Sequence, residues 1–214
     1  MRVCHVITGL GRGGAEHALY RLIAGEGSSS EILVISLTDS GIFGDRLRQL
    51  GIRVEALGLS RSFPSPFKLW RLGKLILEWR PAVVQTWMYH ADLLGGIVAR
   101  LSGFPVCWGI RNSILARGVG AFPTRIVVHL CAILSRWVPA RVISCSERAV
   151  SIHQAFGYSA NFRVVPNGVE AAKWFTRLNV RSDMRSELGV SDCDFVFAHA
   201  GRSDPLKDHR GLAV

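Results

Sequence analysis

The chain has 214 residues, of which 49% are hydrophobic and 20% are charged, so it is long and apolar enough to bury a sizeable core. These values exclude a disordered or fibrous protein and fit one large domain, or one domain with part of another. The formal net charge of +10 favours anionic partners, but the Lys and Arg residues are dispersed rather than gathered in a run with interleaved aromatic residues, which disfavours nucleic acid.

Short apolar runs alternate with helical patterns over most of the chain. Strands are predicted at residues 2–8, 31–37, 53–57, 82–86, 106–110, 141–145 and 162–165, and helices at residues 15–24, 43–50, 66–78, 91–101, 123–135 and 146–156. Ser146 is a suitable N-cap for the last of these helices. Almost continuously hydrophobic strands separated by helices indicate a parallel sheet covered on both faces. The predicted fold is a doubly wound α/β, Rossmann-like domain that binds ligands at the carboxyl ends of its strands.

The C-terminal part predicts the start of a second domain. Pro166, Asn167 and Gly168 supply a turn, and a short helix at 183–188, a strand at 195–200 and a polar loop at 201–209 follow. A lone strand cannot bury both of its faces, and a complete Rossmann-type domain needs about 150 residues. We therefore expect a first domain at residues 1–168 and an incomplete second Rossmann-like domain at residues 169–214.

The cysteines and the apolar stretches indicate a cytoplasmic protein. Five cysteines lie far apart, none in metal-ligand spacing, and are expected to be small buried hydrophobes without disulfides: Cys4, Cys107, Cys131, Cys145 and Cys193. The longest apolar stretches, 93–101 and 126–134, are shorter than the roughly 20 residues of a membrane span. The N-terminal apolar run is a strand rather than a signal peptide, because it is short and ends in a glycine loop.

A basic amphipathic pattern follows residue 66. Lys68, Arg71, Lys74 and Arg80 alternate with apolar residues that include Trp70, Leu72, Leu75 and Trp79. Such a pattern is typical of a solvated helix face, and also of a helix that lies on a membrane surface.

The first loop, Gly9 to Gly14, satisfies G-x-G-x-x-G between a predicted strand and a predicted helix. Glycines allow backbone amides to approach a ligand closely, and a helix N-terminus favours negative charge. Asp39, near the end of the second strand, suits a ribose-binding acid. A nicotinamide or flavin enzyme and a ligand-free tight turn therefore both remain alternatives on this loop alone.

A second loop carries two cations after the strand predicted at 195–200. Arg202 and Lys207 are five residues apart, with Gly201 as a hinge. Arg makes bidentate contacts to phosphate and Lys acts as a point charge, so the pair suits a diphosphate. Isolated cations of this kind are also common on protein surfaces.

Four segments together resemble the family-4 glycosyltransferases of the GT-B fold, which have two Rossmann-like domains facing a cleft. These segments, in order, are Gly13-Gly14-Ala15-Glu16, Trp87-Met88-Tyr89-His90-Ala91-Asp92, Val164-Val165-Pro166-Asn167-Gly168-Val169, and Gly201-Arg202 with Lys207-Asp208-His209. They span almost the whole chain. A Rossmann dehydrogenase predicts neither the Pro-Asn-Gly crossing nor the Arg/Lys loop.

The resemblance implies roles for particular residues. Gly13 and Gly14 are expected to approach the donor phosphates or the acceptor, and Arg202 and Lys207 to hold the diphosphate of the donor and stabilise it as it leaves. His90 corresponds to a family histidine near the transferred sugar, where positioning or electrostatics is expected rather than nucleophilic attack.

After the next strand, Arg111 and Asn112 are the candidate acceptor-binding residues. The resemblance further implies retention of the anomeric configuration, no metal and no cofactor. The expected donor is a UDP-sugar and the expected acceptor a glycan or lipid-linked glycan, in cell-surface polysaccharide biosynthesis. We expect a cytoplasmic protein with peripheral contact at the inner face of the membrane.

This sequence departs from the family pattern after the second loop. The family carries a Glu-x7-Glu segment further along, which binds the donor sugar and ribose, and the 214 residues do not contain it. The chain alone is therefore expected to transfer little or no sugar. The alternative to a truncated enzyme is a non-catalytic remnant that binds an acceptor or a partner protein.

Overall fold

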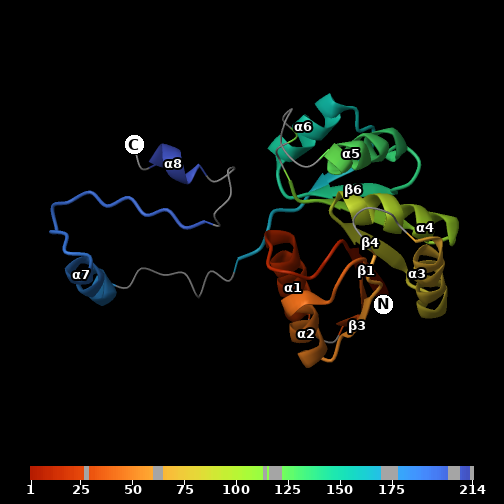
Figure 1. The fold of residues 1–214 in the computed structure, drawn as a ribbon, viewed down its shortest axis with the longest axis horizontal. Coiled ribbons are helices and arrows are strands. Elements are labelled where there is room, and N and C mark those ends of the chain that lie inside the picture. Colours follow the sequence, from red (N-terminus) through yellow and green to blue (C-terminus); the bar gives the residue numbers. More distant parts are fainter. Residues whose placement is uncertain are drawn as a thin grey trace. The chain divides into compact units, whose positions relative to one another are not determined.

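The computed structural model describes residues 1–26, 29–59, 65–112, 115, 122–169, 178–201 and 208–212. The chain divides into two compact units, Met1–Gly168 and Val169–Val214. The first unit contains a seven-stranded sheet with helices on both faces (Figure 1). The described part of the second unit contains the helices α7 (Leu178–Glu187) and α8 (His209–Leu212).

The sheet of the first unit is parallel throughout, in the order β3-β2-β1-β4-β5-β6-β7. Its strands are β1 (Arg2–Ile7), β2 (Glu31–Ser36), β3 (Arg53–Ala56), β4 (Val83–Trp87), β5 (Val106–Ile110), β6 (Arg141–Ser144) and β7 (Phe162–Val164). The chain first builds outward from β1 to β3 and then crosses to β4 on the other side of β1. This confirms the doubly wound fold and places its switch point, where ligands bind in such sheets, between β1 and β4.

Two hydrophobic cores lie on opposite faces of the sheet. One joins Leu19 of α1 (Gly14–Glu26) and Leu47 of α2 (Gly41–Gln49) to Ile7 of β1 and to alternate residues of β2. The other joins the remaining alternate residues to Leu72 of α3 (Pro66–Trp79), Ala99 of α4 (Gly96–Leu101) and Cys131 of α5 (Phe122–Leu134). Figure 1 shows α1 and α2 on one side of β1 and β3, with α3 and α4 on the other.

The strand burial and the helix caps agree with the sequence patterns that predicted them. In β1 and β2 every residue after the first is buried, which explains why both strands are continuous apolar runs rather than alternating ones. The Ser146 hydroxyl oxygen accepts the Ala149 N–H at 3.2 Å and caps α6 (Glu147–Phe156). Gly157 ends this helix with a φ of 111°, in the left-handed region that favours glycine.

Two predictions about local structure were wrong. Residues 195–200 form no strand, because the described part of the second unit offers no neighbouring strand to share backbone hydrogen bonds; Phe195 and Phe197 are each 83% exposed. The helix predicted at 91–101 is present within those bounds, although its first part is a π-helical turn, η2 (Ala91–Gly95), that continues into α4. Cys193 is exposed rather than buried, whereas all five cysteines are free as expected.

Candidate functional site

The candidate site lies where the carboxyl ends of β1, β4 and β5 meet. Ile7 is opposite Trp87 in the parallel register, and the Met88 N–H donates to the Gly109 carbonyl at 3.1 Å, so the three strands end at a similar level. The glycine loop follows β1, His90 follows β4, and Arg111 with Asn112 follows β5. The topology thus brings the predicted residues of the first unit to one edge of the sheet, at its switch point.

The glycine loop is anchored at its middle and open near the start of α1. Leu10 is fully buried, and its carbonyl accepts the Phe43 N–H at 3.0 Å. At Gly14, an added Cβ would meet no other atom within 4 Å, so the loop is open on that side. At Gly13, a Cβ would collide with the Glu16 carboxylate. An anion that binds beside Gly13 would therefore have to turn Glu16 aside.

The segment after β4 has an unusual backbone. Met88 has a φ of 71°, which is uncommon for a residue with a side chain, and the chain then enters the π-helical turn η2. Both features recur at functional sites, where surrounding packing sustains the strain. His90 is half-buried and lies between them, immediately before η2.

Asp92 is a buried acid on η2 directly behind this segment. Its Oδ1 accepts the Thr86 hydroxyl at 2.5 Å and the Gly109 N–H at 3.3 Å, and it is 1% exposed. Burial raises the pKa of Asp92 to about 8, although the two hydrogen bonds and the positive charge of Arg111 act in the opposite direction. These contacts tie the start of η2 to the ends of β4 and β5.

Arg111 connects the end of β5 to the end of the first unit. Its guanidinium carbon lies 4.3 Å from the centre of the Trp87 ring, within the range of a cation–π contact. Its Nη1 donates to Asn167 Oδ1 at 2.7 Å, within the Pro-Asn-Gly segment. Burial lowers the pKa of Arg111, with Cys145 and Asp92 acting in the opposite direction. Asn112 is exposed beside it.

Two buried histidines support this edge from behind. His5 Nδ1 accepts the Trp87 indole N–H at 3.2 Å, and burial lowers the pKa of His5 to about 4. His153 Nδ1 lies 2.7 Å from the Ala149 carbonyl and so carries the proton, which leaves Nε2 to accept the Tyr89 hydroxyl at 2.8 Å. Both histidines are therefore neutral structural groups in the folded chain.

A sequence profile of Glycosyltransferase Family 4 matches residues 12–173, which is more than half of the chain. The chain belongs to glycosyltransferase family 4. A galactosyltransferase of Escherichia coli, UDP-Gal:alpha-D-GlcNAc-diphosphoundecaprenol alpha-1,3-galactosyltransferase, is 25% identical over 140 residues, which are 64% of this chain and 36% of that enzyme.

Solved structures match this family-4 chain over almost its full length. HepE from Anabaena, solved in complex with UDP, superposes with a TM-score of 0.78 at 22% identity, covering 98% of this chain and 56% of HepE. A UDP-N-acetylglucosamine 2-epimerase from Rickettsia bellii matches with a TM-score of 0.55 at 16% identity, covering 89% of this chain and 52% of the epimerase. An epimerase shares this fold, so the fold alone does not distinguish the two reactions, and the family assignment comes from the sequence profile.

Membership of glycosyltransferase family 4 displaces the oxidoreductase alternative that the glycine loop left open. The chain spans about half the length of HepE and about a third of the E. coli enzyme. Among the described residues of this glycosyltransferase chain, no group of three or more His, Cys, Asp or Glu could hold a metal ion. In the same part of the chain, no helix is long and apolar enough to cross a membrane.

The structure describes some of the predicted site residues and not others. It brings Gly14, His90 and Arg111 to the same edge, whereas Arg202 and Lys207 lie outside the described residues. Sequence reasoning missed Asp92 and Asn167 as part of this edge. A lone acid in an otherwise apolar helical segment was the available signal for Asp92, but the 56-residue separation of Arg111 and Asn167 left no local signal.

Proposed function

We propose that this chain supplies the acceptor-side half of a retaining glycosyltransferase, which moves a sugar from a UDP-sugar to a glycan or lipid-linked glycan in cell-surface polysaccharide biosynthesis. The observation that carries the proposal is the common edge of β1, β4 and β5, where an open glycine loop, a half-buried histidine and an anchored arginine meet at the switch point.

The names of the relatives support the choice of donor and acceptor. HepE was solved in complex with UDP and with UDP-glucose, and the E. coli enzyme is named for a UDP-galactose donor and a diphosphoundecaprenol-linked acceptor. A UDP-hexose and a lipid-diphosphate-linked sugar are therefore the substrates to test first. An acceptor of this kind would hold the protein at the inner face of the membrane.

Each candidate residue has a role in this proposal. Gly13 and Gly14 let the substrate approach the N-terminus of α1, where backbone N–H groups favour negative charge. His90 positions the transferred sugar beside η2. Arg111, held at this edge by Trp87 and Asn167, orients a phosphate or hydroxyl of the acceptor, with Asn112 next to it.

The second loop serves the donor. Arg202 and Lys207 hold the diphosphate and stabilise the charge that develops as UDP leaves, the kind of fixed electrostatic contribution that dominates many enzymes. On this assignment, residues 1–168 are the acceptor side and residues 169–214 begin the donor side. We further propose that transfer needs the part of the family structure that this chain does not cover, so that the 214 residues alone transfer little or no sugar.

The test measures transfer of labelled sugar from UDP-glucose and UDP-galactose to a polyprenyl-diphosphate-linked GlcNAc. It compares the 214-residue chain with the longest product its gene encodes, whose mass is established by immunoblot. Three results would support the proposal. A product longer by about one domain should transfer sugar, and NMR of the new linkage should show retention. The rate of transfer should fall about 100-fold in Arg202→Ala and in Lys207→Ala. Turnover by the 214-residue chain would overturn the division between the two halves, and an endogenous product of 214 residues that binds acceptor without turnover would favour a non-catalytic binding protein.

A further inference from the structure

Residues 88–92 leave the end of β4 in a conformation that the local sequence does not favour. Met88 has a φ of 71° although it is not a glycine, and the chain turns directly into η2. A residue with a side chain keeps such a conformation only where the surrounding structure holds it there. His90 lies inside this segment, so the contacts that hold the segment also set the position of His90.

Tyr89 ties this segment to two helices. It lies between Met88 and His90, is 9% exposed, and its hydroxyl lies 2.8 Å from Nε2 of His153 on α6. Its carbonyl accepts the thiol of Cys131, on α5, at 3.5 Å. A tyrosine that is bonded both at its backbone and at the far end of its ring has little freedom, so the residues on either side of it are held as well.

His153 is itself held in one orientation. Its ring is fully buried, and Nδ1 donates to the Ala149 carbonyl, one turn earlier in α6, at 2.7 Å. The ring of Tyr158 packs edge-on against it, with ring centres 5.0 Å apart. With the proton on Nδ1, Nε2 can only accept, so the Tyr89 hydroxyl is the donor.

The contact between Tyr89 and His153 is polar where an apolar pair could fill the same space. A buried hydrogen bond adds little net stability over well-packed apolar side chains, but a satisfied buried network fixes a single geometry. The two partners are 64 positions apart in the sequence, so the contact makes the conformation after β4 depend on α6. Its contribution is therefore to the placement of residues 88–92 more than to the stability of the fold.

We propose that His153 is a positioning residue for sugar transfer: through the Tyr89 hydroxyl, it holds residues 88–92 in the conformation that places His90 at the carboxyl edge of the sheet. The inference rests on the proposed function, in which His90 lies beside the transferred sugar. Because His153 is fully buried, it acts through Tyr89 and not by contact with substrate.

Three variants separate the hydrogen bond from the volume of its partners. Tyr89→Phe removes the hydroxyl and keeps the ring, and His153→Met removes the acceptor while filling a similar volume. In His153→Gln, the amide oxygen can still accept from Tyr89. The position of His90 is read by NMR from its ring signals in the 214-residue chain with isotopically labelled histidine, assigned by their absence in His90→Gln. In parallel, kcat and KM are measured for sugar transfer by the longest product of the gene.

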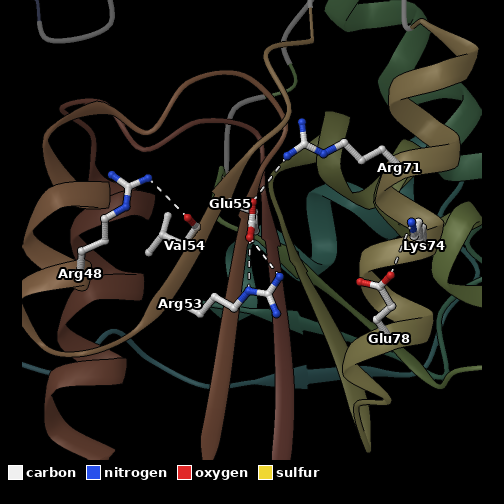
Figure 2. Close-up of polar contacts among 7 residues, drawn as sticks. All are labelled: Arg48, Arg53, Val54, Glu55, Arg71, Lys74 and Glu78. Atoms are coloured by element: carbon white, nitrogen blue, oxygen red, sulfur yellow. Dashed lines mark hydrogen bonds and ion pairs between the residues drawn. The ribbon is translucent and has the colours of Figure 1, made fainter.

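Two control variants remove contacts elsewhere in the first unit. The buried Ser135 hydroxyl accepts the Ser159 N–H at 2.8 Å, so Ser135→Ala breaks a buried hydrogen bond between the end of α5 and the segment after α6. Figure 2 shows that Arg71 of α3 reaches the Glu55 carboxylate of β3 at 3.6 Å, and Glu55→Gln weakens this contact. Circular dichroism and thermal unfolding establish that every variant is folded at the temperature of the assay.

In Tyr89→Phe and His153→Met, we expect the His90 ring signals to move and to broaden, because residues 88–92 are no longer held in one conformation. The signals of His17, on α1, should stay in place. A general loss of stability in a chain that is still folded would not move the His90 signals alone.

The same two variants should lower kcat about tenfold to 100-fold at an unchanged KM for the UDP-sugar. Combining them should cost no more than either change alone, because both break the same contact. His153→Gln, Ser135→Ala and Glu55→Gln should keep the His90 signals and the kcat of the wild type.

Unmoved His90 signals in Tyr89→Phe and His153→Met would overturn the inference, as would an unchanged kcat. An equal fall of kcat in Ser135→Ala would also overturn it, because the loss would then follow from stability and not from placement. If the wild-type longer product transfers no sugar, the proposed function fails, and the His90 signals of the 214-residue chain still decide whether His153 holds this segment.

Discussion

Replacing Asp92 by asparagine tests whether the acid behind His90 is protonated in the folded chain. The asparagine side chain keeps the shape of the carboxylic acid and cannot ionise. Asp92 is 1% exposed, and burial raises its pKa from 3.8 to about 8. In the protonated state its O–H can donate to Thr86 Oγ1, because the Thr86 hydroxyl has a second acceptor in the Cys107 carbonyl, 3.3 Å away.

The direction of the pH dependence follows from the two pKa values. The folded chain binds the proton on Asp92 more tightly than the unfolded chain does, so the folded state carries an additional proton between pH 3.8 and about 8. The stability that this proton contributes is present in full below pH 3.8 and is lost as the pH rises through about 8. Each pH unit is worth about 1.4 kcal/mol, so the full change is about 6 kcal/mol.

Urea unfolding at pH 5, 6, 7, 8 and 9 measures this change. Tryptophan fluorescence, to which the buried Trp87 and Trp108 contribute, follows the unfolding. Relative to Asp92→Asn, the wild type should lose about 4 kcal/mol between pH 5 and pH 8 and little more beyond pH 9. Asp45→Asn, on the exposed part of α2, controls for the loss of one negative charge. Parallel pH profiles of wild type and Asp92→Asn would refute the argument, because they would mean that Asp92 is ionised beside Arg111.

Three further predictions concern the framework of the site. The pKa of His5 is lowered from 6.5 to about 4, so its contribution is present above pH 6.5 and lost as the pH falls through 4. His5→Gln should reduce the acid loss of stability by about 3 kcal/mol in a urea series extended below pH 4. Gly109→Ala should lower the stability of the folded chain by about 1–3 kcal/mol, because its Cβ would lie 2.5 Å from the Thr86 carbonyl oxygen. Gly25→Ala, in open space on α1, should raise that stability by up to about 1 kcal/mol. Thermal unfolding measures both changes. A double-mutant cycle of Arg111→Ala and Asn167→Ala should give a coupling of about 1 kcal/mol; a coupling of zero would mean that the contact does not hold the two segments together.

The layout of the first unit could be predicted from the sequence because its signals are local. Val106 to Ile110 is a strand with the predicted bounds, and the Ser146 cap marks the start of α6 where expected. A parallel strand buried on both faces needs a continuous apolar run, and a helix start needs an oxygen that accepts the first free N–H groups. These requirements leave their mark on neighbouring residues.

The details of the candidate edge could not be predicted in the same way. Met88 has a positive φ without the glycine that would have signalled it, and η2 has the composition of an ordinary apolar helix. The contact between Trp87 and His5 joins residues 82 positions apart, so no window of sequence contains it. Likewise, the faces of α3 are decided by its packing against the sheet, which turned Leu72 inward and left Trp70 outside.

The central claim is that the carboxyl edge of the first unit binds substrate, and mapping of amide chemical shifts in the isotopically labelled chain tests it most directly. The chain would be titrated with UDP and with a water-soluble short-chain prenyl-diphosphate-linked GlcNAc. The account predicts changes at Gly13, Gly14, His90 and Arg111, with no change at Arg2 or Glu31, which lie at the opposite ends of β1 and β2. Changes confined to that opposite edge, or no change with either ligand at millimolar concentration, would contradict it.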